Sequence, residues 1–308
     1  MGRFDDRLTS PQPGLKEIWK ILREGGFRGK GIDRDAEAAK VPVKRGPLPA
    51  VPAGKASLTW VGHATYLIRV NGQAILTDPV MGPGIPGRIK RRVPLGLRWD
   101  ELPPIDAVVL SHDHYDHLDA KTVKRLGPTV RYFVPLGTAA WFRKRGLKDV
   151  TELDWWQSAD LGSTKLTFVP AHHWCRRTPW DTNQRLWGGW VIAPKGGPKL
   201  YFAGDTGYGH WFSAIGKTHP DIDTAILPIG AYAPRWFMGP VHLDPDEAVR
   251  AAADVGAKRL ASMHWGTFVL TQEPMLEPLE LIRAAWTKAE RPRADLLDLA
   301  IGESRLVG

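Results

Sequence analysis

The segment "AVVLSHDHYDHLD", residues 107–119, ends an apolar run with a dense group of side chains that bind metals. Its "HDHYDH" core places His112, His114, Asp116 and His117 within six positions. Residues two apart in an extended chain point to the same side, so His112 and His114 can reach one ion together. Imidazole and carboxylate groups both suit zinc. The spacing therefore predicts a metal-binding loop.

The second half of this loop points to a second ion. A turn at Tyr115-Asp116 would direct Asp116 and His117 away from the first pair of histidines, towards another point nearby. A polar loop without metal, or a chance cluster on the surface, is the alternative interpretation. A single histidine would favour that alternative, but three in six residues with a neighbouring aspartate favour metal.

A metal site also needs donors from elsewhere in the chain. The segments "FVPAHHWC", "LYFAGDTG" and "LASMHWGT" each end an apolar run, at His172-His173, Asp205 and His264. Each is weak evidence alone, because a strand-end aspartate is usually a turn residue and a strand-end histidine is usually only hydrogen-bonded. Together with the first loop, they predict one shared centre. Spacing does not choose between His172 and His173.

Short strands and intervening helices must position these donors. Residues 57–78 are predicted to form strands, with a hairpin turn at Asn71-Gly72. Later strands are expected at 107–110, 131–134, 165–169, 190–192, 199–204, 224–229, 259–263 and 296–301. Helices are expected at 119–126, 137–146, 244–256 and 277–290. In the third of these helices, Asp244 can cap the N-terminus and Gly256 can close the C-terminus.

The simplest division is an N-terminal arm, residues 1–55, and one domain, residues 56–308. The arm holds the helical candidate "LKEIWKILREGG", in which Ile18, Trp19 and Leu22 share an apolar face. That face either lies in a membrane interface or packs on the domain, and packing is slightly favoured.

The charge balance favours anionic partners. Lysine and arginine number 42 against 33 aspartates and glutamates, a net charge of +9, which suits phosphates, lipid headgroups or nucleic acid. The segment "GRIKRR", with Arg88, Lys90, Arg91 and Arg92, is expected to be exposed and to dock on anionic membranes, with a merely solvated loop as the equal alternative.

The remaining composition indicates a compartment. The single cysteine, Cys175, fits a reducing environment, and the N-terminus lacks a secretory signal pattern. No run approaches about 20 apolar residues, so no membrane span is expected. We therefore expect a cytoplasmic protein that meets a membrane, if at all, peripherally at its inner surface.

The pattern "HDHYDH", followed in order by histidine, aspartate and histidine, resembles the metallo-β-lactamase superfamily. Over about residues 56–305 the chain is similar to its N-acyl-phosphatidylethanolamine-hydrolysing phospholipase D branch, in segments that include "WVGHATYLI", "LTDPV", "HHWCRRT", "FAGDTGY", "LPIGAYAPRWFM", "HLDPDEAVR" and "MHWGTF". The resemblance implies an α/β fold, a four-layer αβ/βα sandwich with a dinuclear site at one edge between two sheets.

The resemblance also implies which residues act. It assigns His112, His114 and His173 to one zinc ion and Asp116, His117 and His264 to a second, with Asp205 bridging both. It implies catalytic roles for Asp116 and Asp205, and contact of Tyr115 and His242 with the substrate headgroup. His173 is preferred to His172 because the family pattern has a non-histidine at the first position, and His172 is expected behind the ligands. His63 is expected only to pack or hydrogen bond, and Cys175 to be a buried, inert thiol.

The implied reaction is phosphodiester hydrolysis, which releases phosphatidic acid and an N-acylethanolamine. Two zinc ions would lower the pKa of a bound water and polarise a phosphoryl oxygen, and iron and manganese stay open as alternatives. One competing hypothesis is another hydrolase on the same site, acting on a lactone or on a nucleic-acid phosphodiester. No appended nucleic-acid domain is visible, so no specific nucleic-acid partner is expected. The other hypothesis is a non-enzymatic membrane-surface protein. A homodimer stays open.

Overall fold

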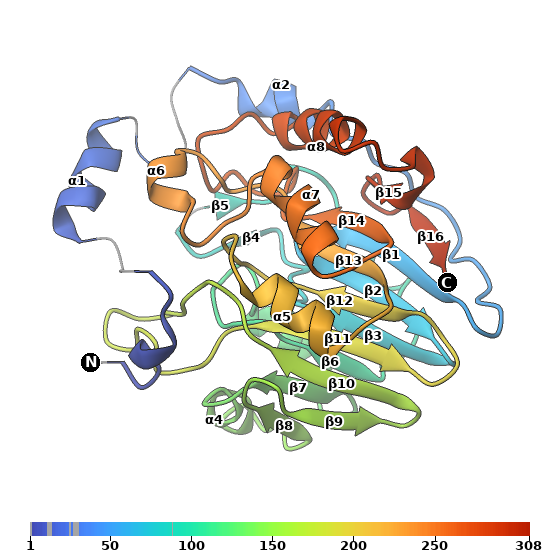
Figure 1. Ribbon diagram of the computed structural model, residues 1–308. Helices are drawn as coiled ribbons and strands as arrows, with labels where there is room; N and C mark the ends of the chain where they lie inside the picture. The colour runs from blue at the N-terminus through green and yellow to red at the C-terminus, as the bar shows by residue number, and fades with distance from the viewer. Residues whose placement is uncertain (1, 11–13, 25, 27–30, 88) are drawn as a thin grey trace.

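The computed structural model describes residues 2–10, 14–24, 26, 31–87 and 89–308. Within these residues, two seven-stranded mixed sheets pack face to face (Figure 1). The first sheet has the order β16 (Ser304–Val307), β1 (Ala56–Gly62), β2 (Thr65–Val70), β3 (Gln73–Thr77), β6 (Ala107–Val109), β7 (Arg131–Pro135) and β8 (Val150–Leu153). The second has the order β15 (Leu296–Leu297), β14 (Arg259–Met263), β13 (Ile222–Pro228), β12 (Lys199–Phe202), β11 (Gly189–Pro194), β10 (Thr164–Val169) and β9 (Ser158–Leu161). A two-stranded ribbon, β4 (Gly84–Ile85) with β5 (Ile89–Lys90), lies apart from both.

Strand direction decides where the loops gather. In the first sheet β3, β6, β7 and β8 run parallel, and in the second β12, β13, β14 and β15 do. β10 pairs antiparallel with β11, and β11 pairs antiparallel with β12, so β10 and β12 point the same way. The carboxyl ends of these strands therefore open on one edge of each sheet, where binding sites of open α/β sheets form.

Helices cover both outer faces of the sheet pair. α3 (Ala120–Leu126) and α4 (Ala139–Arg143) pack Val123 and Phe142 against the first sheet. α5 (Trp211–Thr218), α7 (Pro245–Asp254) and α8 (Glu277–Lys288) cover the second sheet (Figure 1). Large apolar side chains such as Trp60, Tyr66 and Trp190 fill the space between the sheets. The expected four-layer αβ/βα sandwich is confirmed.

The short remaining helices belong to the arm and to loops. The arm carries η1 (Asp5–Arg7), α1 (Leu15–Arg23) and α2 (Arg34–Ala38), while α6 (Arg235–Met238) and η2 (Arg293–Asp295) interrupt the domain. Residues 2–10 lie against the domain: Phe4 donates its backbone N–H to the Asn183 carbonyl (2.9 Å), and the Thr9 hydroxyl lies 2.6 Å from His172 Nδ1. Every described helix is too short or too polar to cross a bilayer.

Two expectations about exposed segments need correction. The expected helix forms as α1, Leu15–Arg23, but it buries Ile21, and its Ile18, Trp19 and Leu22 face points to solvent rather than packing on the domain. In "GRIKRR", the Arg91 guanidinium turns inward, donates to the Gly82 carbonyl (3.0 Å) and lies over the Phe268 ring. Amphipathic spacing tells which residues share a face, but not which face finds partners.

The other basic residues of that segment differ in their surroundings. Arg92 pairs with Asp35 at 2.6 Å, which leaves Lys90 as the exposed cation of the ribbon's described residues. Arg88 lies outside the described residues. The expected strands and helices of the domain are all present. The additional elements that the sequence analysis did not predict are α5, α6, η2, β4, β5, β8, β9 and β16.

The capping of α7 follows the expected chemistry. The Asp244 carboxylate accepts from the Glu247 backbone N–H (2.8 Å), and Glu247 reaches back to the Asp244 backbone N–H (3.2 Å). Pro245 occupies the first turn, and Gly256 ends the helix at φ +72°. The capping residue Asp244 lies two residues after His242, so the cap also fixes the chain beside the candidate site.

We expect Asp244→Ala to lower the free energy of unfolding by about 1 kcal/mol, because the backbone N–H of Glu247 loses its acceptor. Chemical denaturation measures the change. Asp246→Ala, an exposed first-turn aspartate of the same helix, is the matched control and should cost less. Equal losses for the two variants would show that the cap contributes nothing.

Candidate metal centre

The predicted metal ligands converge at the carboxyl edge of the two sheets. The loop after β6 supplies His112, His114, Asp116 and His117. The loops that follow β10, β12 and β14 supply His173, Asp205 and His264, respectively. The sheets face each other, so loops far apart in sequence meet here. At Gly204, beside Asp205, a side chain would overlap with Ser111, which explains the glycine before this aspartate.

The first cluster consists of three imidazoles. His112 Nε2 lies 2.9 Å from His114 Nδ1, and His114 Nδ1 lies 3.3 Å from His173 Nε2. Ser111 Oγ lies 2.9 Å from His112 Nδ1, and the Val241 carbonyl lies 3.1 Å from His173 Nδ1. These partners turn Nε2 of His112 and of His173 towards the common point.

The second cluster combines a carboxylate and two imidazoles. Asp116 Oδ2 lies 3.6 Å from His117 Nε2 and 3.5 Å from His264 Nε2. Neither of these two nitrogens has a hydrogen-bond partner within the part of the chain that the structure describes. Both nitrogens are buried, and a buried polar nitrogen that has no partner is costly in free energy.

Asp205 lies between the two clusters. Its Oδ2 atom is 3.1 Å from His117 Nε2 and 3.2 Å from His264 Nε2 in the second cluster. The same atom is 3.9 Å from His112 Nε2 and 4.0 Å from His173 Nε2 in the first. One carboxylate oxygen is thus shared by both groups, as a bridging ligand requires.

These spacings fit bound ions. A tetrahedral zinc ion with ligand bonds of about 2.0–2.1 Å keeps its donor atoms roughly 3.3 Å apart. Most separations within each cluster scatter around that value. The donor set of buried imidazoles and carboxylates suits zinc and also iron or manganese, so it indicates two divalent ions without fixing the element.

The protonation of the clusters supports the same conclusion. Burial, reinforced by neighbouring imidazoles, holds the pKa of His112 and His114 well below the ordinary value, so both rings are neutral and able to bind metal. Burial opposes ionisation of Asp205, but His117 and His264 together outweigh it and hold the pKa of this carboxyl well below its usual range. Burial also opposes protonation of His264, yet Asp205 and Asp116 together raise its pKa to about 9, so metal uptake near neutral pH releases protons.

The sequence profile described as "Beta-lactamase superfamily domain" matches residues 73–265, which hold all of the gathered donors. The chain belongs to the metallo-β-lactamase superfamily. The N-acyl-phosphatidylethanolamine-hydrolyzing phospholipase D 1 of Caenorhabditis elegans is 37% identical over 298 residues, 88% of this chain and 82% of that protein. An uncharacterised protein of Mycobacterium tuberculosis is 40% identical over 261 residues, 80% of this chain and 68% of that one.

A solved structure supports the fold of this superfamily member. The isothiocyanate hydrolase from Delia radicum gut bacteria matches with a TM-score of 0.66 at 20% identity, over 81% of this chain and 98% of that one. Such low identity concerns the fold alone. The family and the buried paired clusters together make this chain a metal-dependent hydrolase of the metallo-β-lactamase fold.

The two residues expected at the headgroup flank the clusters. Tyr115 is partly exposed beside Asp116, donates its hydroxyl to the Arg177 carbonyl (2.8 Å) and lies under the Arg177 guanidinium. His242 is buried, with its ring centroid 5.3 Å from that of His173, and its Nδ1 has no partner among the described residues. Their contact with substrate stays a prediction.

Residues behind the ligands meet the sequence expectations in part. His172 lies outside both clusters and contacts Thr9, in agreement with its expected place behind the ligands. His63 hydrogen bonds with its Nε2 to Asp116 Oδ2 (3.1 Å), as expected of a non-ligand, although its position would also allow it to reach a metal. Cys175 is buried, and burial raises the pKa of its thiol, so it is inert.

Asp78 is a candidate site residue that the sequence analysis missed. Its Oδ2 atom accepts from His117 Nδ1 (2.6 Å), and its Oδ1 atom accepts from the Ser111 backbone N–H (2.7 Å). A carboxylate behind a metal-binding histidine fixes the ring and its tautomer. The signal was present in "LTDPV", where an aspartate ends an apolar strand, as Asp205 does.

We expect Asp205→Asn to abolish turnover and to lower the occupancy of both ions, because a neutral amide is a poor bridging ligand. The fold should survive, since Asp205 follows a strand end. Elemental analysis and activity on the same folded sample measure this, with Asp223→Asn in the same sheet as control. Wild-type kinetics with both metals retained would show that Asp205 is only a turn residue.

We expect Asp78→Asn to weaken metal binding about 10- to 100-fold, because His117 loses its charged partner. Titration with a competing chelator gives the two affinities, and the loss should fall mainly on the cluster that contains His117. Asp106→Asn is the control, because Asp106 caps the Ala74 backbone N–H in the same sheet, away from the ligands. An unchanged affinity would show that Asp78 does not support metal binding.

Proposed function

We propose that this protein is a phosphodiesterase of phospholipase D type, which hydrolyses N-acyl-phosphatidylethanolamine to phosphatidic acid and an N-acylethanolamine. The observation that carries the proposal is a cavity of about 470 Å³ beside His114 and Asp116. A headgroup phosphate would lie against the clusters, and acyl chains would extend along the cavity.

The lining of this cavity suits an amphiphilic anion. Ile85, Pro86, Ile89 and Leu270 give it apolar walls. Arg176 is exposed at the same cavity and lies over the Trp174 ring, so it offers a positive charge to a phosphate. Arg177 has a different role, because its guanidinium donates to the Asp113 (2.6 Å) and Leu118 (2.9 Å) carbonyls and holds the ligand loop in place.

The chain's own residues would orient the phosphodiester. Burial lowers the pKa of His242 to about 3, so its ring is neutral, and its buried Nδ1, which has no partner among the described residues, would bind a phosphoryl oxygen. Tyr115 lines the cavity together with His114 and Asp116, and the alcohol half of the substrate would lie against it. Asp116 and Asp205 stay ionised and hold the clusters at a fixed spacing.

The bound ions would supply the remaining chemistry. When bound, two divalent ions would polarise a phosphoryl oxygen and activate water for an in-line displacement. The water oxygen would join phosphorus, the bond from phosphorus to the N-acylethanolamine oxygen would break, and that oxygen would take the proton that the water loses. Electrostatic stabilisation by preorganised groups accounts for most of such catalysis.

The metal-replete protein should release phosphatidic acid and an N-acylethanolamine in equal amounts. Mass spectrometry of products from a panel with N-acyl-phosphatidylethanolamine, phosphatidylcholine, a lactone and RNA measures this. In ¹⁸O-water the label should enter phosphatidic acid and not the alcohol. Asp205→Asn controls for contaminating lipases. Turnover of the lactone or of RNA alone would favour another hydrolase on the same site.

A further inference from the structure

The helix α1 presents its apolar side to solvent. Trp19 is 66% exposed, Leu22 57% and Ile18 39%, although their spacing places all three on one stripe of the helix. Only Ile21 among the described apolar side chains of α1 is fully buried. A surface helix of a globular domain normally buries such a stripe, so the orientation of α1 is the reverse of the usual one.

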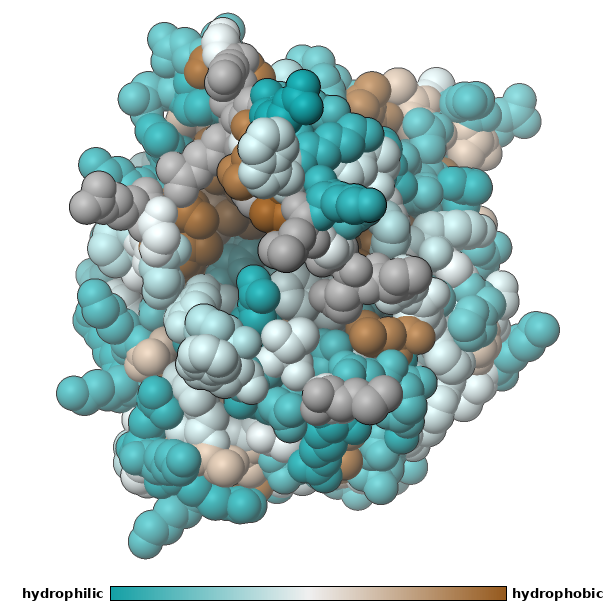
Figure 2. Space-filling model, turned by 90° about the vertical axis from the view of Figure 1, so that its left-hand side faces the viewer, coloured by the Kyte–Doolittle hydropathy of each residue, from teal (hydrophilic) through white to brown (hydrophobic). Residues whose placement is uncertain are grey.

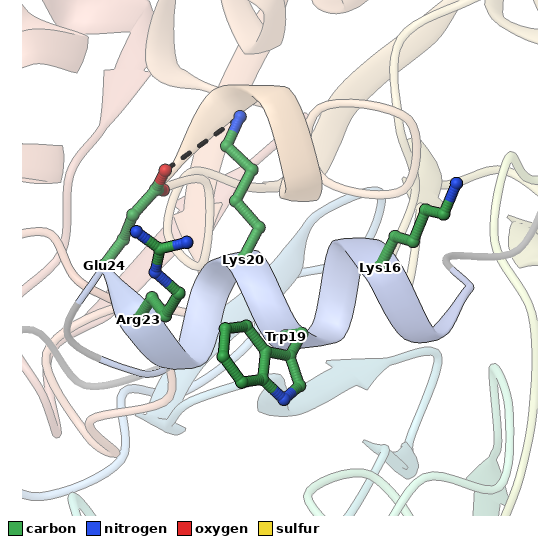
Figure 3. Close-up of a pocket in the computed structure, with 5 residues that line it drawn as sticks. All are labelled: Lys16, Trp19, Lys20, Arg23 and Glu24. Carbon is green, nitrogen blue, oxygen red and sulfur yellow. Dashed lines mark ion pairs between the residues drawn. The ribbon is translucent and has the colours of Figure 1, made fainter.

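Basic side chains accompany this stripe. Lys16, Lys20 and Arg23 line an open hollow of about 700 Å³ along α1, together with Trp19 and Glu24 (Figure 3). The Arg23 guanidinium lies over the Trp19 ring, 5.8 Å from its centroid. Lys20 pairs with Glu24 at 4.0 Å, while neither Lys16 nor Arg23 has an ion pair within the described residues. Cations beside an exposed apolar stripe characterise helices that lie in a membrane interface.

Contacts with α6 join this helix to the candidate site. Lys20 Nζ lies 4.0 Å from the Trp236 ring centroid, and Trp236 Nε1 donates to Glu24 Oε2 (3.2 Å). The segment that follows α6 carries His242, beside the first metal cluster. Figure 2 shows the side of the molecule on which α1 and α6 lie, and its surface is hollowed there, with apolar residues around part of the hollow.

We propose that α1 docks the protein on a bilayer that contains anionic phospholipid. Ile18, Trp19 and Leu22 enter the interface, and Lys16 and Arg23 meet lipid phosphates. Charge complementarity selects this occupant over a second copy of the chain, since two copies joined through α1 would bring their lysines and arginines together. The inference extends the proposed function, because docking would hold a phospholipid beside the site, but binding is measured without turnover.

The test is co-sedimentation of the full chain with vesicles. One set contains phosphatidylcholine alone, and the other contains equal parts of phosphatidylcholine and phosphatidylglycerol. The wild type should bind the second set more tightly, with an advantage that falls as salt rises. The double variant Trp19→Ala with Leu22→Ala should bind about 10-fold more weakly or worse, because two side chains no longer enter the interface.

Matched variants separate the two halves of the proposal. Lys16→Gln with Arg23→Gln should remove the preference for phosphatidylglycerol. Leu281→Ala with Leu306→Ala, which removes two leucines that are 39% and 40% exposed on α8 and β16, should leave binding unchanged. Thermal unfolding should be unaffected in the α1 variants, since the altered side chains are exposed.

Two results would overturn the proposal. One is vesicle binding that the α1 variants leave intact. The other is a wild-type dimer in sedimentation equilibrium that these variants dissociate, which would make a second copy the occupant. Turnover of detergent-dispersed N-acyl-phosphatidylethanolamine tests the proposed function separately, because the Trp19→Ala, Leu22→Ala variant should cleave it at the wild-type rate. Loss of vesicle binding with retained turnover is the expected combination.

Discussion

The buried histidines depend on their electrostatic interaction with the negatively charged Asp205 carboxylate, which offsets the cost of their burial. Its Oδ2 atom lies within 3.1 Å and 3.2 Å of imidazole nitrogens in one cluster and within 3.9 Å and 4.0 Å of those in the other. Burial of so many polar rings is costly unless opposite charge or metal compensates it. Loops from both sheets meet at Asp205, so one carboxylate interacts with histidines from each sheet.

The same constraint explains the polar groups behind the ligands. Asp78 orients His117, His63 holds Asp116, and the Val241 carbonyl orients His173. Each partner comes from a different loop at the carboxyl edge of the sheets. The centre is therefore fixed by packing of the whole edge and not by the "HDHYDH" segment alone, as precise metal geometry requires.

The sequence was informative where an apolar run stops at a donor. His112, Asp205 and His264 could be found this way, because the pattern shows both the strand and its polar end. Asp78 has the same signal, but nothing local separates a turn aspartate from one that orients a ligand ring. The outward face of α1 could not be predicted either, because periodicity shows that Ile18 and Leu22 share a side without showing what that side meets. Arg91 illustrates the same limit, since a basic segment does not reveal which of its cations turns inward.

The central claim is that two ions share Asp205 between a three-histidine cluster and a cluster of Asp116, His117 and His264. Anomalous diffraction from crystals of the metal-replete protein, measured on both sides of the zinc absorption edge, tests it most directly. The account predicts two peaks roughly 3.5–4 Å apart, with Asp205 between them. A single peak, or a second peak liganded by His63 in place of Asp116, would contradict it.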